Sequence, residues 1–263
     1  MVATKRSGTH FLSLVFVAAL LVGCGKRKQE VALQVSLPER PRAAEVPQAR
    51  PATHEPVMRS TRGAFGLAHA PYFPNGAMPV YALMHGLGDT PEGECPWFET
   101  ATRARGYLLC PKGNVAYSGG FAWNHNKEQV RERFDGAWLA TGNLLDHQVS
   151  TPRRTQNTLI GFSNGASAAA EAAIAQPGEW QHLILLAMKV SLDVNKLKKA
   201  GVERIVFAAG EHDMSAHSMQ LEAKRLNTAG LPTLYLSLGK VGHTFPRDLP
   251  TRLETALGWL ESP

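Results

Sequence analysis

The sequence lacks several features that would assign it to a broad class. It has no internal repeat, no H-E-x-x-H motif and no comparable grouping of metal ligands. Its apolar run at residues 11–22 is too short for a stable membrane-spanning helix, which needs about 20 apolar residues. These absences argue against a metal hydrolase and against a helix that holds the mature protein in a bilayer, and we expect neither a metal ion nor another cofactor.

Residues 66–263 also lack the excess of basic over acidic residues that a nucleic-acid-binding surface would need. The chain has 28 lysines and arginines against 22 aspartates and glutamates. Residues 1–65 hold ten of the basic and four of the acidic residues, so residues 66–263 carry eighteen of each. Because a nucleic-acid-binding domain needs a basic face, no nucleic-acid partner is expected.

The first 24 residues resemble a bacterial lipoprotein signal. Lys5 and Arg6 precede the apolar run, as in an export signal, and the run ends in LVGC at residues 21–24, which is similar to the lipobox. The resemblance implies cleavage before Cys24 and acyl chains on that cysteine. These chains would anchor the protein to a membrane of the bacterial cell envelope, with its domain in the periplasm or outside the cell. An ordinary signal peptide with a chance cysteine is the alternative.

Composition divides the chain into three parts. Residues 1–24 are the signal, and residues 25–65 contain five prolines, scattered charge and little apolar periodicity, which predicts a disordered tether. The basic residues 26–28 of this tether would lie beside anionic lipid headgroups. Residues 66–263 are enough for one complete core and form the expected folded domain.

Two cysteines remain in this domain, Cys95 and Cys110. A leftover pair in an exported chain favours a disulfide, and two free thiols are the alternative. A bridge that closes a loop of about 15 residues would stabilise the fold by roughly 3 kcal/mol.

Short apolar runs alternate with helical patterns along the domain. The runs predict strands at residues 80–84, 107–110, 158–162, 182–187, 202–208 and 231–238. Helices are expected at residues 95–106, 164–176, 193–200, 215–228 and 246–260, with further helical segments between 124 and 147. Strands that are apolar throughout and alternate with helices predict an α/β fold with a mostly parallel sheet covered on both faces.

Reactive side chains follow four of these strands directly. In a parallel sheet such residues meet at the carboxyl edge, where ligands bind. Ser163 lies in GFSNG at residues 161–165, Asp213 in GEHD at 210–213, and His243 in GKVGH at 239–243. His85 opens HGLG at residues 85–88.

These motifs, in this order, resemble the α/β-hydrolase superfamily from about residue 78 to the end. The likeness is greatest to small cap-free esterases such as dienelactone hydrolase and the phospholipase/carboxylesterase group. It implies that Ser163 is a nucleophile on a sharp strand-to-helix turn, His243 its base and Asp213 the orienting acid. The backbone N–H groups of Leu87 and Asn164 would bind the oxyanion.

Each of these roles has an alternative. Ser163 is also suited to cap a helix, and Asp193 or Glu211 to serve as the acid. His212 and His217 are alternative bases, although they lie next to the acid turn. These alternatives, and whether Cys95 and Cys110 are bridged, remain open in the sequence.

The substrate is less clearly indicated than the chemistry. Only about 14 residues separate the strands that end near 187 and begin near 202, which leaves no room for a large cap. His85 is a candidate for substrate binding as an orienting or hydrogen-bonding residue. Aromatic side chains near the carboxyl edge are further candidates for a substrate pocket: Trp97, Phe98, Phe121 and Trp123. We expect a membrane-tethered serine hydrolase that acts on small-molecule or lipid esters. The alternatives are a peptidase, a thioesterase and a non-catalytic binding protein, and the oligomeric state is unknown.

Overall fold

The computed structural model describes residues 59–73, 78–124, 126–142, 156–189 and 191–262. The signal with Cys24, most of the expected tether and residues 143–155 lie outside these ranges. The described residues all belong to one of two units of the chain, Arg50–Pro263. Within this described part, no helix is both long and apolar enough to cross a membrane.

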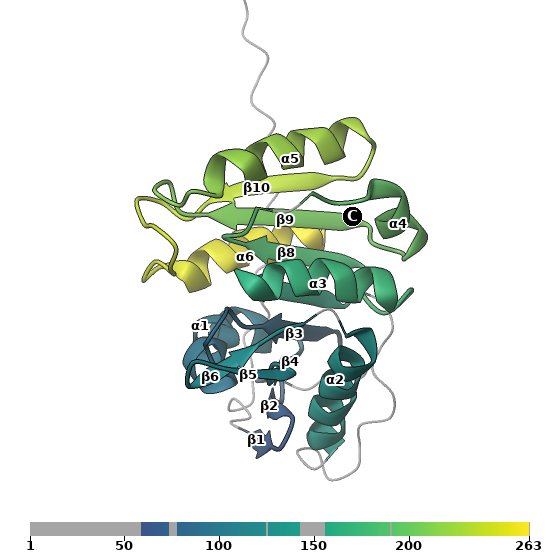
Figure 1. The fold of residues 1–263 in the computed structure, drawn as a ribbon, viewed down its shortest axis with the longest axis vertical. Coiled ribbons are helices and arrows are strands. Elements are labelled where there is room, and N and C mark those ends of the chain that lie inside the picture. The colour runs from purple at the N-terminus through teal and green to yellow at the C-terminus, as the bar shows by residue number, and fades with distance from the viewer. Residues whose placement is uncertain (1–58, 74–77, 125, 143–155, 190, 263) are drawn as a thin grey trace, which may run out of the picture. The chain divides into compact units, whose positions relative to one another are not determined.

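An eight-stranded sheet forms the centre of the domain, in the order β1-β2-β4-β3-β7-β8-β9-β10 (Figure 1). All its strand pairs are parallel except β1 with β2 and β2 with β4. The expected mostly parallel sheet is confirmed. The bounds are β1 Ser60–Gly63, β2 Gly66–His69, β3 Val80–Met84, β4 Tyr107–Pro111, β7 Thr158–Phe162, β8 His182–Leu186, β9 Arg204–Ala209 and β10 Thr233–Ser237.

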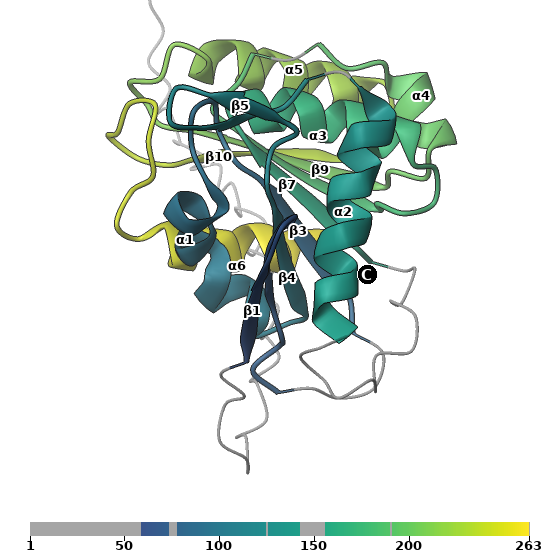
Figure 2. The same ribbon diagram turned by 60° about the horizontal axis from the view of Figure 1, so that its bottom comes forward.

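Helices cover both faces of the sheet (Figure 2). On one face lie α1 (Pro91–Arg103) and α6 (Leu249–Leu260). On the other lie α2 (Lys127–Gly142), α3 (Asn164–Ala175), α4 (Val194–Lys199) and α5 (Ala216–Thr228). Strand β3 shows why its residues are apolar throughout, since successive side chains point to opposite faces. Ala82 and Met84 pack under α2 and α3, whereas Tyr81 and Leu83 pack under α1 and α6.

The strand order reverses between β3 and β7. From β3 the chain passes to β4 on one side, and it later returns to place β7 on the other side. At such a reversal the connections after the two strands pass to opposite faces, and this part of the carboxyl edge is where open α/β sheets bind ligands. His85 follows β3 and Ser163 follows β7, so the sequence places both at this edge.

Three local expectations need correction. Strand β1 lies inside the range assigned to the tether, so the ordered part begins before residue 66. Helix α1 begins at Pro91 rather than Cys95, because Thr90 caps it by accepting the Gly93 N–H and proline occupies the first helical position. No strand is expected between residues 110 and 158, but a hairpin of β5 (Val115–Tyr117) and β6 (Gly120–Ala122) follows β4.

The β5-β6 hairpin is held against the loop that follows β3. Ser118 and Gly119 form its two-residue turn, with φ values of 46° and 85° that match the twist of a tight hairpin. The Gly88 N–H donates to the Phe121 carbonyl at 2.8 Å, and the Phe121 N–H donates to the Asp89 carbonyl at 2.9 Å. The hairpin thus holds the loop of residues 85–89, which we call the oxyanion loop for the role expected of its Leu87 N–H.

Candidate active site

Ser163 occupies a strained turn between β7 and α3. Its φ of 53° and ψ of −119° are unfavourable for a residue with a side chain. A Cβ at Gly161 would lie 2.4 Å from the Gly165 carbonyl oxygen, and one at Gly165 would lie 2.0 Å from the Met84 carbonyl oxygen. The two glycines are therefore required by the bend and by the approach of β3. The turn places the Ser163 hydroxyl at the carboxyl edge of the sheet, immediately before α3.

The structure brings Ser163, His243 and Asp213 into one hydrogen-bonded chain. The Ser163 Oγ lies 2.9 Å from His243 Nε2, and His243 Nδ1 lies 2.8 Å from Asp213 Oδ2. Each residue follows a different strand, so the sheet sets their separation. His243 is exposed, whereas Asp213 is buried. The imidazole can therefore receive a proton from the serine while the acid holds its other nitrogen.

Ser215 completes the surroundings of the acid. The Asp213 Oδ1 accepts hydrogen bonds from the Ser215 N–H and Oγ, both at 2.7 Å. Burial alone would raise the pKa of Asp213, but the bonds from Ser215 and His243 outweigh it and lower the pKa. Asp213 is therefore a carboxylate at neutral pH. Sequence reasoning did not identify Ser215 as a hydrogen-bond partner of this acid. An acceptor residue two positions before a serine is a common turn pattern, and it is the signal that was available.

The alternative acids and bases lie elsewhere. Asp193 is exposed and caps α4 by accepting the N–H groups of Asn195 and Lys196. Glu211 is exposed and accepts a hydrogen bond from a serine hydroxyl on β10. His212 and His217 are exposed, and the imidazole that contacts both Ser163 and Asp213 is that of His243.

His85 orients the oxyanion loop from inside the protein. Its Nε2 accepts the Gly113 N–H at 3.0 Å, so the ring proton is on Nδ1, which donates to the Gly86 carbonyl oxygen at 2.8 Å. Burial lowers the pKa of His85, which keeps the ring neutral. The Gly86 carbonyl and the Leu87 N–H point in opposite directions across one planar trans peptide. The imidazole thereby fixes the direction of the Leu87 N–H.

Asn164 and Trp123 join the Ser163 turn to this loop. The Asn164 side chain accepts the Trp123 N–H at 2.8 Å and donates to the Trp123 carbonyl at 3.3 Å. The Trp123 indole donates to the His85 carbonyl at 3.1 Å. His85, Phe98 and Trp123 are all buried, so the expectation that these side chains line a substrate pocket is wrong. Instead, His85 and Trp123 hydrogen-bond the backbone of the loop after β3.

Several exposed apolar side chains lie on the loops at the carboxyl edge of the sheet. Leu87 on the oxyanion loop and Tyr117 on β5 are about half exposed, and the Tyr117 ring lies beside Gly88. Met214, the residue after the acid, is fully exposed. Single exposed apolar residues are ordinary, but these lie on segments that adjoin the reactive residues, and we call them the apolar border.

Aromatic rings extend this apolar border toward α1. Phe245 lies 4.5 Å from Phe162 and 5.7 Å from Trp97 between ring centroids, and Phe162 is 5.1 Å from the His243 ring. Trp97 is exposed and Phe121 half-buried, so these two of the expected substrate-side aromatics remain accessible.

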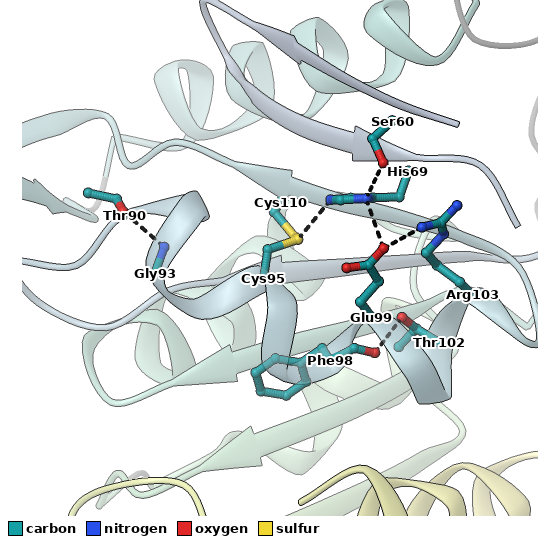
Figure 3. Close-up of a disulfide and its surroundings, with 10 residues drawn as sticks. All are labelled: Ser60, His69, Thr90, Gly93, Cys95, Phe98, Glu99, Thr102, Arg103 and Cys110. Atoms are coloured by element: carbon teal, nitrogen blue, oxygen red, sulfur yellow. Dashed lines mark hydrogen bonds and ion pairs between the residues drawn. A yellow bond between two sulfur atoms is a disulfide. The ribbon is translucent and has the colours of Figure 1, made fainter. Parts of the chain in front are cut away.

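Cys95 and Cys110 form a disulfide between α1 and β4 (Figure 3). His69 on β2 lies against it, with Nε2 3.5 Å from the Cys95 Sγ. Burial lowers the pKa of His69. The bridge anchors the first turns of the helix that follows the oxyanion loop.

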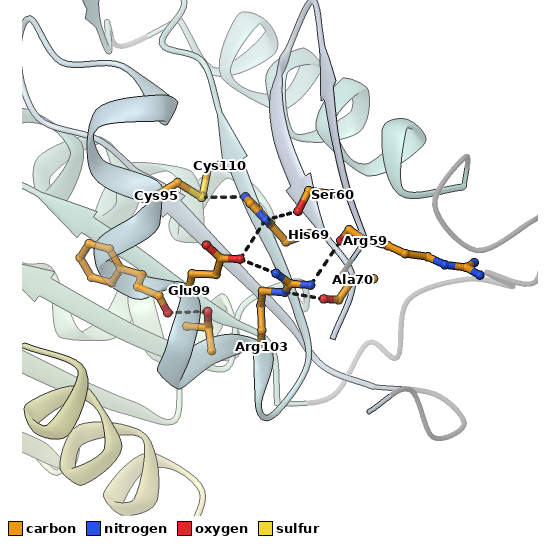
Figure 4. Close-up of polar contacts among 10 residues, drawn as sticks. Arg59, Ser60, His69, Ala70, Cys95, Glu99, Arg103 and Cys110 are labelled. Carbon is orange, nitrogen blue, oxygen red and sulfur yellow. Dashed lines mark hydrogen bonds and ion pairs between the residues drawn. A yellow bond between two sulfur atoms is a disulfide. The ribbon is translucent and has the colours of Figure 1, made fainter. Parts of the chain in front are cut away.

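A polar cluster beside the disulfide attaches the first hairpin to α1 (Figure 4). His69 Nδ1 lies 2.8 Å from the Ser60 Oγ and 3.6 Å from a Glu99 carboxylate oxygen. Glu99 pairs with Arg103, whose Nε donates to the Ala70 carbonyl at 2.7 Å. These contacts explain why β1 and β2 are ordered although β1 is largely exposed.

No metal site is found in the part of the chain that the structure describes, since no three histidines, cysteines or carboxylates are grouped there. The described site thus consists of a hydroxyl, an imidazole, a carboxylate and backbone N–H groups.

Neither family models nor curated protein sequences match this chain. The structure is similar to fluorophosphonate-binding serine hydrolase F of Staphylococcus aureus, with a TM-score of 0.57 and 12% identity over 80% of this chain and 100% of that one. Esterase PE8 matches with a TM-score of 0.52 and 16% identity over 79% and 98%.

An uncharacterized protein from Bacillus cereus ATCC 10987 matches with a TM-score of 0.56 and 14% identity. The match covers 72% of this chain and 62% of that protein's length. These similarities show that the chain has the α/β-hydrolase fold. Helix α4 alone joins β8 to β9, so no large cap lies at that point.

Proposed function

We propose that the protein is a serine hydrolase that cleaves carboxylic esters through Ser163, His243 and Asp213. The observation that carries the proposal is the continuous hydrogen-bonded chain from a strained serine to a buried carboxylate. A serine that only caps the helix would need neither the imidazole at 2.9 Å nor the unfavourable φ, and its side chain makes no capping hydrogen bond to α3.

The mechanism follows from the geometry. His243 Nε2 takes the Ser163 proton as the oxygen attacks the ester carbonyl, and Asp213 stabilises the imidazolium that forms. The carbonyl oxygen becomes an oxyanion that accepts hydrogen bonds from the Leu87 and Asn164 N–H groups. Collapse of the intermediate expels the alcohol, which takes the proton from His243. Water, activated by the same imidazole, then hydrolyses the acyl-enzyme.

The apolar border supports an apolar substrate. Leu87, Trp97, Tyr117 and Met214 are exposed on segments that adjoin the reactive residues, and no large cap lies between β8 and β9. An ester with an apolar acyl or alcohol part would cover this surface and gain the transfer free energy of its burial, about 25 cal/mol per Å².

Turnover of matched substrates tests the proposal. We expect the protein to hydrolyse p-nitrophenyl butyrate, with kcat/KM higher than for p-nitrophenyl acetate, and we expect Ser163→Ala to abolish turnover. Ser218→Ala removes a hydroxyl that donates to the Ser215 carbonyl oxygen and not to a residue of the proposed triad, so this variant should keep the wild-type turnover. Full activity in Ser163→Ala would reject the proposal, and preference for the matching thioester or anilide would reassign the substrate class to thioesters or amides.

We also propose the lipid anchor on Cys24. Cys24→Ser should move the protein from the membrane to the soluble fraction, as followed by fractionation of cells that express the full chain. Retention in the membrane would reject the anchor and leave the esterase proposal untouched.

A further inference from the structure

Glu94 is a buried carboxyl group that the mechanism above does not use. It lies in the first turn of α1 and is 2% exposed. Its Oε1 accepts the Gly86 N–H at 2.8 Å, whereas its Oε2 is buried without a hydrogen-bond partner among the described residues. Gly86 directly precedes Leu87, whose N–H is the proposed oxyanion donor. A buried carboxyl that holds this loop therefore needs an explanation.

The contact between Glu94 and the loop leaves little freedom. A Cβ at Gly86 would lie 3.0 Å from Glu94 Oε1 on one side and 3.0 Å from the Phe162 ring on the other. Gly86 is thus enclosed between α1 and the last residue of β7. The next residue of α1, Cys95, is tied to β4 by the disulfide, so the helix cannot shift to relax this contact.

Both hydrogen-bonding groups of the Gly86 backbone are held by buried side chains. Glu94 accepts its N–H, and His85 Nδ1 donates to its carbonyl oxygen. Two successive peptide planes are therefore fixed, and the second of these carries the Leu87 N–H. An oxyanion donor has to be in place before the reaction, because a loop that must reorganise loses the benefit of the bond.

We propose that Glu94 is a positioning residue that holds the oxyanion loop and does so as a neutral carboxylic acid. This inference rests on the proposed function, since it concerns the donor for that reaction. A neutral acid accepts the Gly86 N–H through its carbonyl oxygen without placing a negative charge next to a developing oxyanion. A carboxylate at the same place would oppose that charge.

The surroundings of Glu94 favour the neutral form. Burial raises the pKa of Glu94 to about 8, the Gly86 N–H lowers it, and the charge of Asp89 raises it further. Asp89 is the acidic group that acts on Glu94 from the loop before α1, and His85 on the opposite side of Gly86 is neutral because burial lowers its pKa. The group therefore ionises only as the pH rises through about 8.

Three variants of the full chain test this role. Glu94→Gln keeps a carbonyl oxygen for the Gly86 N–H and cannot ionise, Glu94→Leu keeps the approximate volume and removes the acceptor, and Glu92→Gln changes an exposed glutamate of the same helix. We expect Glu94→Leu to lower kcat for p-nitrophenyl butyrate by about 10²-fold with KM within about threefold, as for the loss of one oxyanion donor. Glu94→Gln should keep kcat at pH 7, and Glu92→Gln should match the wild type.

The pH profile is the readout that a purely structural role would not change. The kcat of the wild type should fall by about tenfold as the pH rises through about 8, because a carboxylate forms near the oxyanion. The kcat of Glu94→Gln should stay level over this range. A level wild-type profile, or the same alkaline fall in Glu94→Gln, would overturn the inference, even if Glu94→Leu does not fold. Activity that depends on Ser163 in all variants would show that the proposed function stands when this inference fails.

Discussion

Replacing Asp213 with asparagine tests the assignment of the acid, and the structure indicates how the variant would fail. Oδ1 accepts both the N–H and the Oγ of Ser215, so the asparagine oxygen should remain at that position. Its NH2 group would then face His243 Nδ1, where a carboxylate oxygen now lies at 2.8 Å. The imidazole would have to accept this hydrogen bond and carry its proton on Nε2. In that tautomer Nε2 cannot receive the Ser163 proton.

The size of the effect follows from that tautomer. Loss of the base through a misplaced proton costs about 10⁴-fold in kcat in a serine triad, equivalent to ~5 kcal/mol of barrier. The kcat for p-nitrophenyl butyrate should fall by this factor in Asp213→Asn, while Asp193→Asn should keep wild-type kcat. Circular dichroism should show both variants folded. An Asp213→Asn variant with more than about a tenth of wild-type kcat, or loss of activity in Asp193→Asn instead, would refute the reasoning.

Three further predictions concern stability. Cys95→Ala with Cys110→Ala should lower the unfolding free energy by roughly 3 kcal/mol, seen as a Tm lower by about 6–12 °C, and a Tm equal to that of the oxidised wild type would contradict the bridge. Gly165→Ala should destabilise by about 3 kcal/mol or more, because its Cβ would lie 2.0 Å from a backbone oxygen of β3, whereas Gly258→Ala, with open space around it, should not; equal Tm values would be inconsistent with the close approach. Glu94→Gln should raise Tm at pH 8 and leave it unchanged at pH 4, since the unfolded chain releases the Glu94 proton above about pH 4.5 while the folded protein retains it to about pH 8; a gain at pH 4 alone would reverse the assigned ionisation.

Strands β3 and β7 were predictable because they are buried on both faces. Residues 80–84 and 158–162 are apolar throughout, and the predicted bounds agree with β3 and β7. Strands β1 and β5 escaped prediction because they are exposed and are ordered by their partner strands rather than by an apolar pattern of their own.

The reactive groups were predictable for a related reason. Ser163, Asp213 and His243 each follow a strand of one parallel sheet, so the fold itself brings them to one edge. Which side of a loop a side chain takes was not predictable. His85 and Trp123 point inward to bind backbone atoms, and Glu94 resembles any acidic residue near a helix start until its contact with Gly86 is seen.

Covalent labelling tests most directly whether the hydroxyl of Ser163 is activated by its imidazole. The full chain would be treated with a fluorophosphonate, and the modified peptide would be identified by mass spectrometry. A single adduct on Ser163, formed at least about 10²-fold more slowly in His243→Ala, is the predicted result. An adduct on another residue, or equal labelling of Ser163→Ala, would contradict the account.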